Sequence, residues 1–249
     1  MTPLVMGAIS FVVGALIGCV GAGGVLIIPA LEYICGLDTH MAMGTALFSF
    51  IFTGSLGTVL YTRKKSMDWR LTVPLCLGSV ITAYIGALSS AYLSARLLNV
   101  LLASMIIFSG VCSLKNSAPV FSENSGLKAP GGFFRVLAIG AGVGLICGMT
   151  GAGGPILSVP VMIVFGFPAL PTIAASQVLQ ITLSSAGSVG NIMNGTINFG
   201  IVWWITALEM FGVAFGVWVA HKVNSATLKK TVAVVCILVG SYILVSALS

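Results

Sequence analysis

Long stretches without charged residues are the feature of this 249-residue sequence that most restricts its fold. Asp, Glu, Lys and Arg are absent from residues 1–31, 71–95, 97–114, 136–208 and 231–249. Each stretch holds the ~18 to 20 residues that a helix needs to cross the hydrocarbon core of a bilayer, and the fourth must cross more than once. Because hydrocarbon offers no hydrogen-bond partners to the backbone, spanning segments of this kind are helical. The sequence therefore predicts an all-α integral membrane protein.

Composition excludes the main alternatives. The chain is 58% hydrophobic and 6% charged, too few charges to cover the surface of a soluble domain. The net charge of +6 comes from basic residues in short connectors, as the positive-inside rule predicts, so we expect no nucleic-acid partner. Only His40 and His221 are available as histidines, and no HExxH, GxSxG or Walker motif occurs. We therefore expect neither an enzyme nor a metal site.

The sequence repeats itself at an offset of 130 positions. Identical residues meet at this offset throughout the chain, among them these pairs: Gly14 and Gly144, Gly18 and Gly148, Gly36 and Gly166, Ser55 and Ser185, Gly57 and Gly187, Gly86 and Gly216, Gly110 and Gly240. We therefore divide the chain into a first membrane repeat (1–114), a linker (115–133) and a second membrane repeat (134–249).

Each repeat has the same plan, in which a Gly-broken helical hairpin precedes three longer apolar segments. The predicted segments are 3–20, 25–37, 41–62, 71–93 and 97–114 in the first repeat, and 134–149, 155–167, 172–193, 201–220 and 227–247 in the second. The hairpin either re-enters or crosses twice, which gives three or five crossings in each repeat.

Basic residues predict how the two repeats are oriented. The connector 63–70 contains four of them, whereas its counterpart 194–200 contains none. Parallel repeats would place seven basic residues inside and four outside, and inverted repeats would place ten inside and one outside. The positive-inside rule therefore favours inverted repeats, each with an odd number of crossings.

The strongest local signal is the GAGG break, which occurs once in each repeat. It consists of Gly21, Ala22, Gly23 and Gly24 in the first repeat and of Gly151, Ala152, Gly153 and Gly154 in the second. If Val25 and Pro155 begin the next helices, the glycine amides would offer unpaired N–H donors and a partial positive charge to an anion. Glycines also let membrane helices pack closely, which is the interpretation that we favour for Gly86, Gly110, Gly216 and Gly240.

Polar side chains lie close to each break. Thr45, Ser49 and Thr53 recur every four residues, as do Ser176, Gln180 and Ser184, so each set shares one helix face, and Thr150 directly precedes the second break. The candidates for anion contact are Thr45, Ser49 and Thr53 in the first repeat, and Thr150, Ser176, Gln177, Gln180, Ser184 and Ser185 in the second. Interhelical hydrogen bonds are the alternative role for the same side chains.

Two carboxylates lie within apolar segments. Carboxylates at membrane depth are costly and often functional, so Glu209 and Glu32 are candidates for proton coupling. The alternatives are a structural hydrogen bond for Glu209 and contact with water for Glu32, which lies near the end of a short helix.

Several motifs together resemble the sulfite exporter TauE/SafE family of bacterial membrane permeases. They are the doubled G-x-x-G-A-G-G at 18–24 and 148–154, the prolines Pro29, Pro155 and Pro160, G-T-A-L-F-S at 44–49, and M-D-W-R at 67–70. The resemblance covers essentially the whole chain. It implies transport of sulfite, sulfoacetate or related organosulfonate or carboxylate anions, with Gly21 to Gly24, Thr45, Gly151 to Gly154 and Ser176 at the motif positions.

These observations predict a multi-pass secondary transporter of the bacterial inner membrane. It would bind a small anion between the two breaks, move it by alternating access, and need no cofactor. An anion channel, or a membrane scaffold or sensor subunit without transport, are the alternatives. The lipid bilayer and the anion are the expected partners, and the sequence leaves a homo-oligomer open.

Overall fold

The computed structural model describes residues 2–21, 23–90, 132–150, 154–193 and 195–248, with isolated positions between 96 and 114. Its elements, in chain order, are α1 (Thr2–Val20), η1 (Gly24–Leu26), α2 (Ile27–Cys35), α3 (Thr39–Arg63), α4 (Trp69–Ser90), α6 (Gly132–Thr150), α7 (Pro155–Val164), α8 (Ala169–Met193), α9 (Phe199–Lys222) and α10 (Ser225–Leu248). The described part of the chain is thus all-helical, as the apolar runs predict.

Four of the described helices are long and apolar enough to cross a membrane. They lie in α3, α4, α6 and α9, and α1, α7 and α10 contain shorter apolar stretches. Many large apolar side chains on these helices are exposed, for example Leu4, Ile81 and Phe211. Such a surface is stable in lipid and not in water, so the fold is that of a multi-pass membrane protein.

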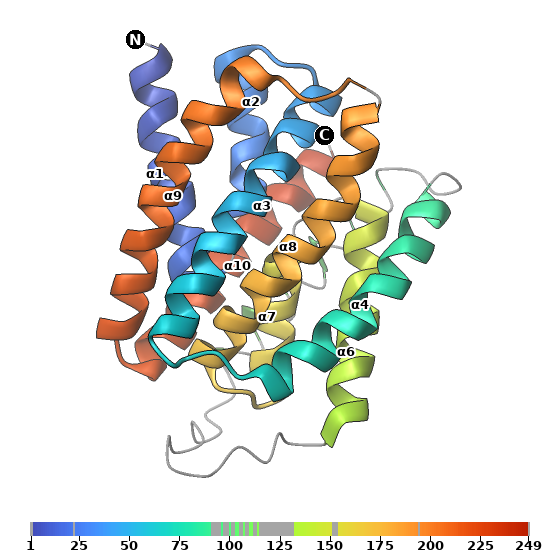
Figure 1. Cartoon of the computed structure of the whole chain (residues 1–249), viewed down its shortest axis with the longest axis vertical. Helices are drawn as coiled ribbons and strands as arrows, with labels where there is room; N and C mark the ends of the chain where they lie inside the picture. The colour runs from blue at the N-terminus through green and yellow to red at the C-terminus, as the bar shows by residue number, and fades with distance from the viewer. Residues whose placement is uncertain are drawn as a thin grey trace.

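Two closely packed helix pairs form the frame of the molecule. In one pair, α1 packs on α9; in the other, α6 packs on α4 (Figure 1). Glycines make this possible, because a Cβ on Gly216 would meet the backbone of Ala15, and one on Gly86 the backbone of Leu145. The packing role predicted for these two glycines is therefore confirmed, and Gly240 likewise lies against Ile107.

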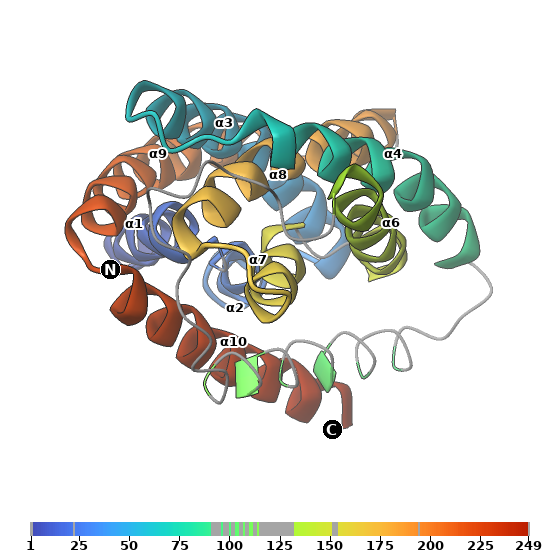
Figure 2. The ribbon, with the colours of Figure 1, turned by 90° about the horizontal axis from the view of Figure 1, so that it is seen from below.

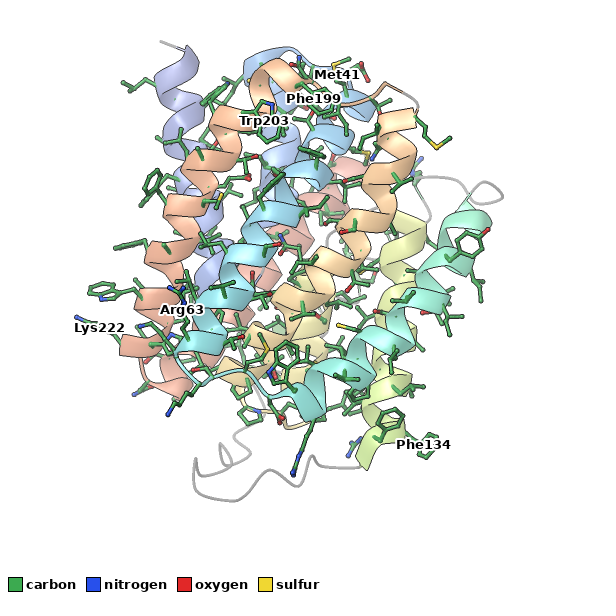
Figure 3. The ribbon with its side chains drawn as sticks, viewed as in Figure 1. Met41, Arg63, Phe134, Phe199, Trp203 and Lys222 are labelled. Atoms are coloured by element: carbon green, nitrogen blue, oxygen red, sulfur yellow. The ribbon has the colours of Figure 1, made fainter. Side chains whose placement is uncertain are left out.

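The helices run in opposing directions within this frame. In Figure 1 the colours show α1 and α3 running downward from the end at which the chain begins, whereas α6 and α8 run upward. The side chains of Met41 and Arg63, near the two ends of α3, give the same direction in Figure 3, and Phe134 marks the lower end of α6. Seen from below, the short helices α2 and α7 lie inside a ring of longer helices (Figure 2).

One predicted boundary is wrong. The second helix of the first hairpin does not begin at Val25, because Gly24–Leu26 forms a 3-10 turn and the α-helix begins at Ile27. At the end of the predicted linker, α6 begins at Gly132, close to residue 134, where the second repeat is predicted to begin. The rest of the predicted linker lies outside the described residues.

Candidate functional site

The first break begins where α1 ends. Gly21 adopts a left-handed conformation, with φ +76°, which an L side chain rarely tolerates. Its amide donates to the carbonyls of Leu16 and Ile17, both at 3.1 Å, so this N–H closes α1 and is not free for a ligand. Gly23 then begins the 3-10 turn without any side-chain cap. The donors that remain for an anion are therefore those at the start of η1 and not that of Gly21.

Two side chains from distant helices bind the broken end of α1. The Nε2 of Gln177 in α8 donates to the Ile17 carbonyl at 3.1 Å, and the Tyr61 hydroxyl in α3 donates to the Gly18 carbonyl at 2.6 Å. Both side chains are fully buried. Tyr61 supplies a partner to the Gly18 carbonyl at the end of α1, and Gln177 adds a second donor to the Ile17 carbonyl, which already accepts from the Gly21 amide. Both bonds tie the break to α3 and α8.

Tyr61 also belongs to a small polar cluster that the sequence did not predict. Its ring lies 5.2 Å from the His221 ring, and the Nε2 of His221 lies 2.7 Å from the Ser66 hydroxyl. The Nδ1 of His221 donates to the Val217 carbonyl at 2.7 Å, because a carbonyl can only accept. The cluster joins the ends of α3 and α9 at the level of Arg63 and Lys222 (Figure 3).

The second break is described from Gly154 onward. Pro155 is the first residue of α7, as predicted, and Gly154 caps this helix without a side-chain hydrogen bond. The hydroxyl of Ser158, one turn later, is buried and has no partner among the described residues. Ala22, Gly151, Ala152 and Gly153 lie outside the described residues, as does the side chain of Thr150.

The two breaks meet inside the bundle. A Cβ placed on Gly21 would lie 2.9 Å from the Val159 Cγ2, 3.2 Å from the Ser176 Oγ and 3.6 Å from the Pro155 Cβ. The end of α1 therefore touches the first turns of α7 and the polar face of α8. The structure thus places Gly21 and Ser176, two predicted site residues from different halves, close to each other.

Packed atoms cover the described glycines of both helix starts. A Cβ on Gly24 would lie 2.8 to 3.2 Å from the Phe50 ring, and one on Gly154 would lie 2.7 Å from the Leu183 Cδ1 and 3.0 Å from the Leu179 Cγ. The predicted open cradle is therefore filled at these two positions. The atoms that cover Gly24 and Gly154 belong to side chains, which can change rotamer. A Cβ on Gly23 would instead meet the main chain of α1, 2.6 Å from the Val13 carbonyl oxygen and 3.0 Å from the Ile17 nitrogen.

The polar side chains of α3 and α8 face the interior, as their spacing predicts. Thr45, Ser49, Thr53, Ser176, Gln177, Gln180 and Ser184 are all buried. Gln180 joins the two helices, since its Nε2 donates to the Phe50 carbonyl at 3.3 Å and to the Thr53 Oγ1 at 3.1 Å. The Gln177 Oε1 and the Ser184 Oγ lie buried with no partner among the described residues. Both atoms can therefore accept a hydrogen bond from a ligand, and the Ser184 hydroxyl can also donate one.

Other predicted residues lie apart from the breaks. Thr45 accepts a hydrogen bond of 3.0 Å from the Asn198 amide in the connector between α8 and α9, so it fastens that connector. Ser185 is half-buried. Ser49 and Ser176 each donate to a carbonyl one turn earlier in their own helices, the alternative role considered for these hydroxyls.

The two carboxylates differ sharply in their surroundings. Glu209 is the only Asp, Glu, Lys or Arg that is buried among the residues whose side chains are described, and both of its oxygens lack a hydrogen-bond partner there. The Ser49 hydroxyl lies beside it. Glu32 is half-buried in the last turns of α2. Within the described chain, no three His, Cys, Asp or Glu side chains gather as a metal site would require.

Sequence comparisons with known proteins identify the family. The family model for the sulfite exporter TauE/SafE matches residues 6–243. The chain is 28% identical to the probable membrane transporter protein YunE of Bacillus subtilis, over 95% of this chain and 94% of that protein. It is 26% identical to the probable membrane transporter protein y4hK of Sinorhizobium fredii, over 94% of each chain. No solved structure matches. The chain is thus a membrane transporter, not an enzyme, and belongs to the sulfite exporter TauE/SafE family.

Proposed function

We propose that the protein is a secondary transporter of a small anion in the bacterial inner membrane, and that it works by alternating access. The substrate class is sulfite or an organosulfur, sulfonate or related carboxylate anion. The family carries the name of a sulfite exporter, and the relatives carry only that of probable membrane transporters, so the substrate rests on the site's chemistry.

One observation carries the proposal: two uncapped helix starts lie inside the bundle, close to each other. Neither η1 nor α7 has a side-chain cap, and the turn that precedes η1 touches the first turns of α7. Helix starts bind anions through their amides and the helix dipole. Binding of this kind needs no buried cation, and the described interior contains no buried Lys or Arg.

The closed packing supports a gated pathway rather than a permanently open pore. Phe50 covers the first helix start, and Leu179 and Leu183 cover the second. We propose that each cover moves in turn, so that the anion reaches the site from one side of the membrane at a time. The second N–H of Gln177 then contacts the anion's oxygens from α8, as do Gln180 and Ser176 once they leave their present hydrogen bonds.

We also propose that the two repeats are inverted. The opposite directions of α1 and α6, and of α3 and α8, support this orientation (Figure 1). The connector after α3 carries Lys64, Lys65 and Arg70, and the connector after α8 carries no charge. By the positive-inside rule, the lower end in Figure 1 faces the cytoplasm.

Flux in proteoliposomes tests the proposal. Purified protein reconstituted in vesicles should exchange radiolabelled sulfite, thiosulfate or sulfoacetate against an internal pool of the same anion, with saturation at high substrate concentration. The substrate should also raise the unfolding temperature in detergent, since it binds only the folded state. Empty vesicles are the control. Large unitary currents without saturation would instead identify an anion channel, and no flux of any of the three anions would contradict the proposal.

A further inference from the structure

Glu209 is held at the junction of three helices. Gly14 of α1 packs directly on the main chain of Glu209, and the Ser49 hydroxyl of α3 lies beside the carboxylate. The side chain is 0% exposed, and neither oxygen has a hydrogen-bond partner among the described residues. A buried carboxylate without a partner is costly, so its retention calls for an explanation.

Packing does not explain it. The equivalent pair, α4 and α6, makes the same contact through Gly144, which packs on the main chain of Ser79. Ser79 is the residue 130 positions before Glu209, and its hydroxyl donates to the Cys76 carbonyl at 2.8 Å. A small serine whose hydroxyl is hydrogen-bonded within its own helix is thus sufficient at this position of a glycine-packed helix pair. The carboxylate in the second half serves another purpose.

Two unpartnered hydroxyls lie one turn before this contact. Ser10 precedes Gly14 by four residues on α1, and Thr206 precedes Glu209 by three on α9. Residues at these spacings share a helix face, and both hydroxyls are buried without a hydrogen-bond partner among the described residues. The junction therefore contains a carboxylate and hydroxyls whose hydrogen-bonding capacity is unused.

No other charge lies beside this carboxylate on the helices packed against α9. These helices are α1 and α3. The titratable side chains of α1 are limited to Cys19, which lies next to Gly216, two turns beyond Glu209. Those of α3 are His40, Tyr61 and Arg63, near its two ends, and those of α9 are His221 and Lys222 at its last turn. Without a neighbouring cation, the uptake of a proton is the direct way to neutralise Glu209.

A short path joins this group to the proposed anion site. Ser49 lies beside Glu209, and the next residue, Phe50, covers Gly24 with its ring. An ionised carboxylate would repel an anion held by the amides at this helix start, whereas a protonated one would not. Protonation and anion binding must therefore favour each other, and each raises the affinity for the other by the same factor.

We infer that Glu209 carries the coupling proton and that the proton and the anion cross together, as symport. The inference rests on the proposed function. It adds the identity of the coupling ion and the direction in which the proton moves relative to the anion. An antiporter would require the two ligands to compete, which the repulsion between an anion and an ionised Glu209 does not produce.

The test uses reconstituted protein, labelled sulfoacetate and a pH-sensitive dye inside the vesicles. An inward proton gradient should drive accumulation of sulfoacetate, and sulfoacetate influx should acidify the lumen of wild-type vesicles. In Glu209→Gln, gradient-driven accumulation should fall at least tenfold, and exchange of sulfoacetate should become independent of pH. Glu32→Gln, which neutralises the other carboxyl of the apolar segments, should keep the response to the gradient.

The substitutions are chosen so that the variant proteins can still fold. Gln has nearly the same shape as Glu, and the three atoms that a Cβ on Gly14 would approach most closely belong to the Glu209 main chain, so the helix pair can form. Glu209→Asp keeps a titratable group and should retain gradient-driven accumulation. The dye measurement on the wild-type protein needs no variant at all.

The outcomes separate the two proposals. Net sulfoacetate influx that leaves the lumen pH unchanged, accumulation driven by a sodium gradient instead, or a Glu209→Gln protein that still responds to the proton gradient would each overturn the coupling inference and leave transport intact. The absence of exchange with sulfite, thiosulfate and sulfoacetate in the wild type would remove the proposed function and the coupling inference with it.

Discussion

The Tyr61 hydroxyl donates a 2.6 Å hydrogen bond to the carbonyl of Gly18, 43 residues earlier in the chain. This carbonyl lies at the broken end of α1, where helical partners run out. In Tyr61→Phe the carbonyl stays buried without that donor, which should lower the free energy of unfolding by ~1–3 kcal/mol. Thermal unfolding in detergent measures the change. The matched control is Tyr84→Phe on the lipid-facing side of α4, which should leave stability unchanged; equal stability of both variants would show that the Tyr61 bond contributes nothing.

Close helix packing on α6 can be tested with two neighbouring glycines. A Cβ on Gly144 would meet Ser79 and Thr82 of α4, whereas nothing lies within 4 Å of one on Gly142. Gly144→Leu should therefore separate α4 from α6 and destabilise the protein by ~1–3 kcal/mol or more, while Gly142→Leu should be tolerated. Size-exclusion chromatography and the unfolding temperature report both. Equal behaviour of the two variants would contradict this packing.

If the amides at the start of η1 bind the anion, substitutions at Gly24 should change the stability of the protein and its affinity for the anion separately. A methyl group in Gly24→Ala would press on the Phe50 ring, and the second change Phe50→Leu should relieve that contact. We expect the double variant to recover stability but to bind sulfite or sulfoacetate at least tenfold more weakly, because the methyl group still occupies the space beside the amides. Isothermal calorimetry measures the affinity. Recovery of binding together with stability would mean that Gly24 serves packing only.

The inverted orientation predicts that two connectors lie on opposite sides of the membrane. A cysteine at Gly195, between α8 and α9, should react with a membrane-impermeant maleimide in intact cells. A cysteine at Lys64, after α3, should react only once the cells are permeabilised. The unmodified chain, with its own six cysteines, gives the background. Labelling of both positions from the same side would rule out inversion.

The parts of the fold that local sequence signals determine could be predicted. Pro155 begins α7 because proline suits a first helical turn, and the four-residue spacing of Thr45, Ser49 and Thr53 places them in the interior. The start of α2 could not be placed, since the run from Gly24 to Leu26 carries no signal that separates a 3-10 turn from an α-helix.

The site was harder to predict because its contacts join distant residues. Nothing near Tyr61 in the sequence indicates that its hydroxyl reaches Gly18, or that its ring lies on His221. The contact of the Phe50 ring with Gly24 also depends on tertiary packing. Phe50 is one apolar residue among many in an apolar helix, so no sequence pattern marks it as the residue that covers the break. The sequence therefore indicates where the backbone breaks but not which side chains close over the break.

The two glycine-packed pairs, α1 with α9 and α6 with α4, each join a helix of one half to a helix of the other. During synthesis, α1 enters the membrane long before its partner exists, and its glycine face must meanwhile be solvated by lipid or by transient neighbours. The final pairing is consequently a late step of biogenesis that takes place inside the bilayer. Neither half, expressed alone, can complete its own helix pair, whereas two halves made as separate chains in one membrane supply both partners of each pair.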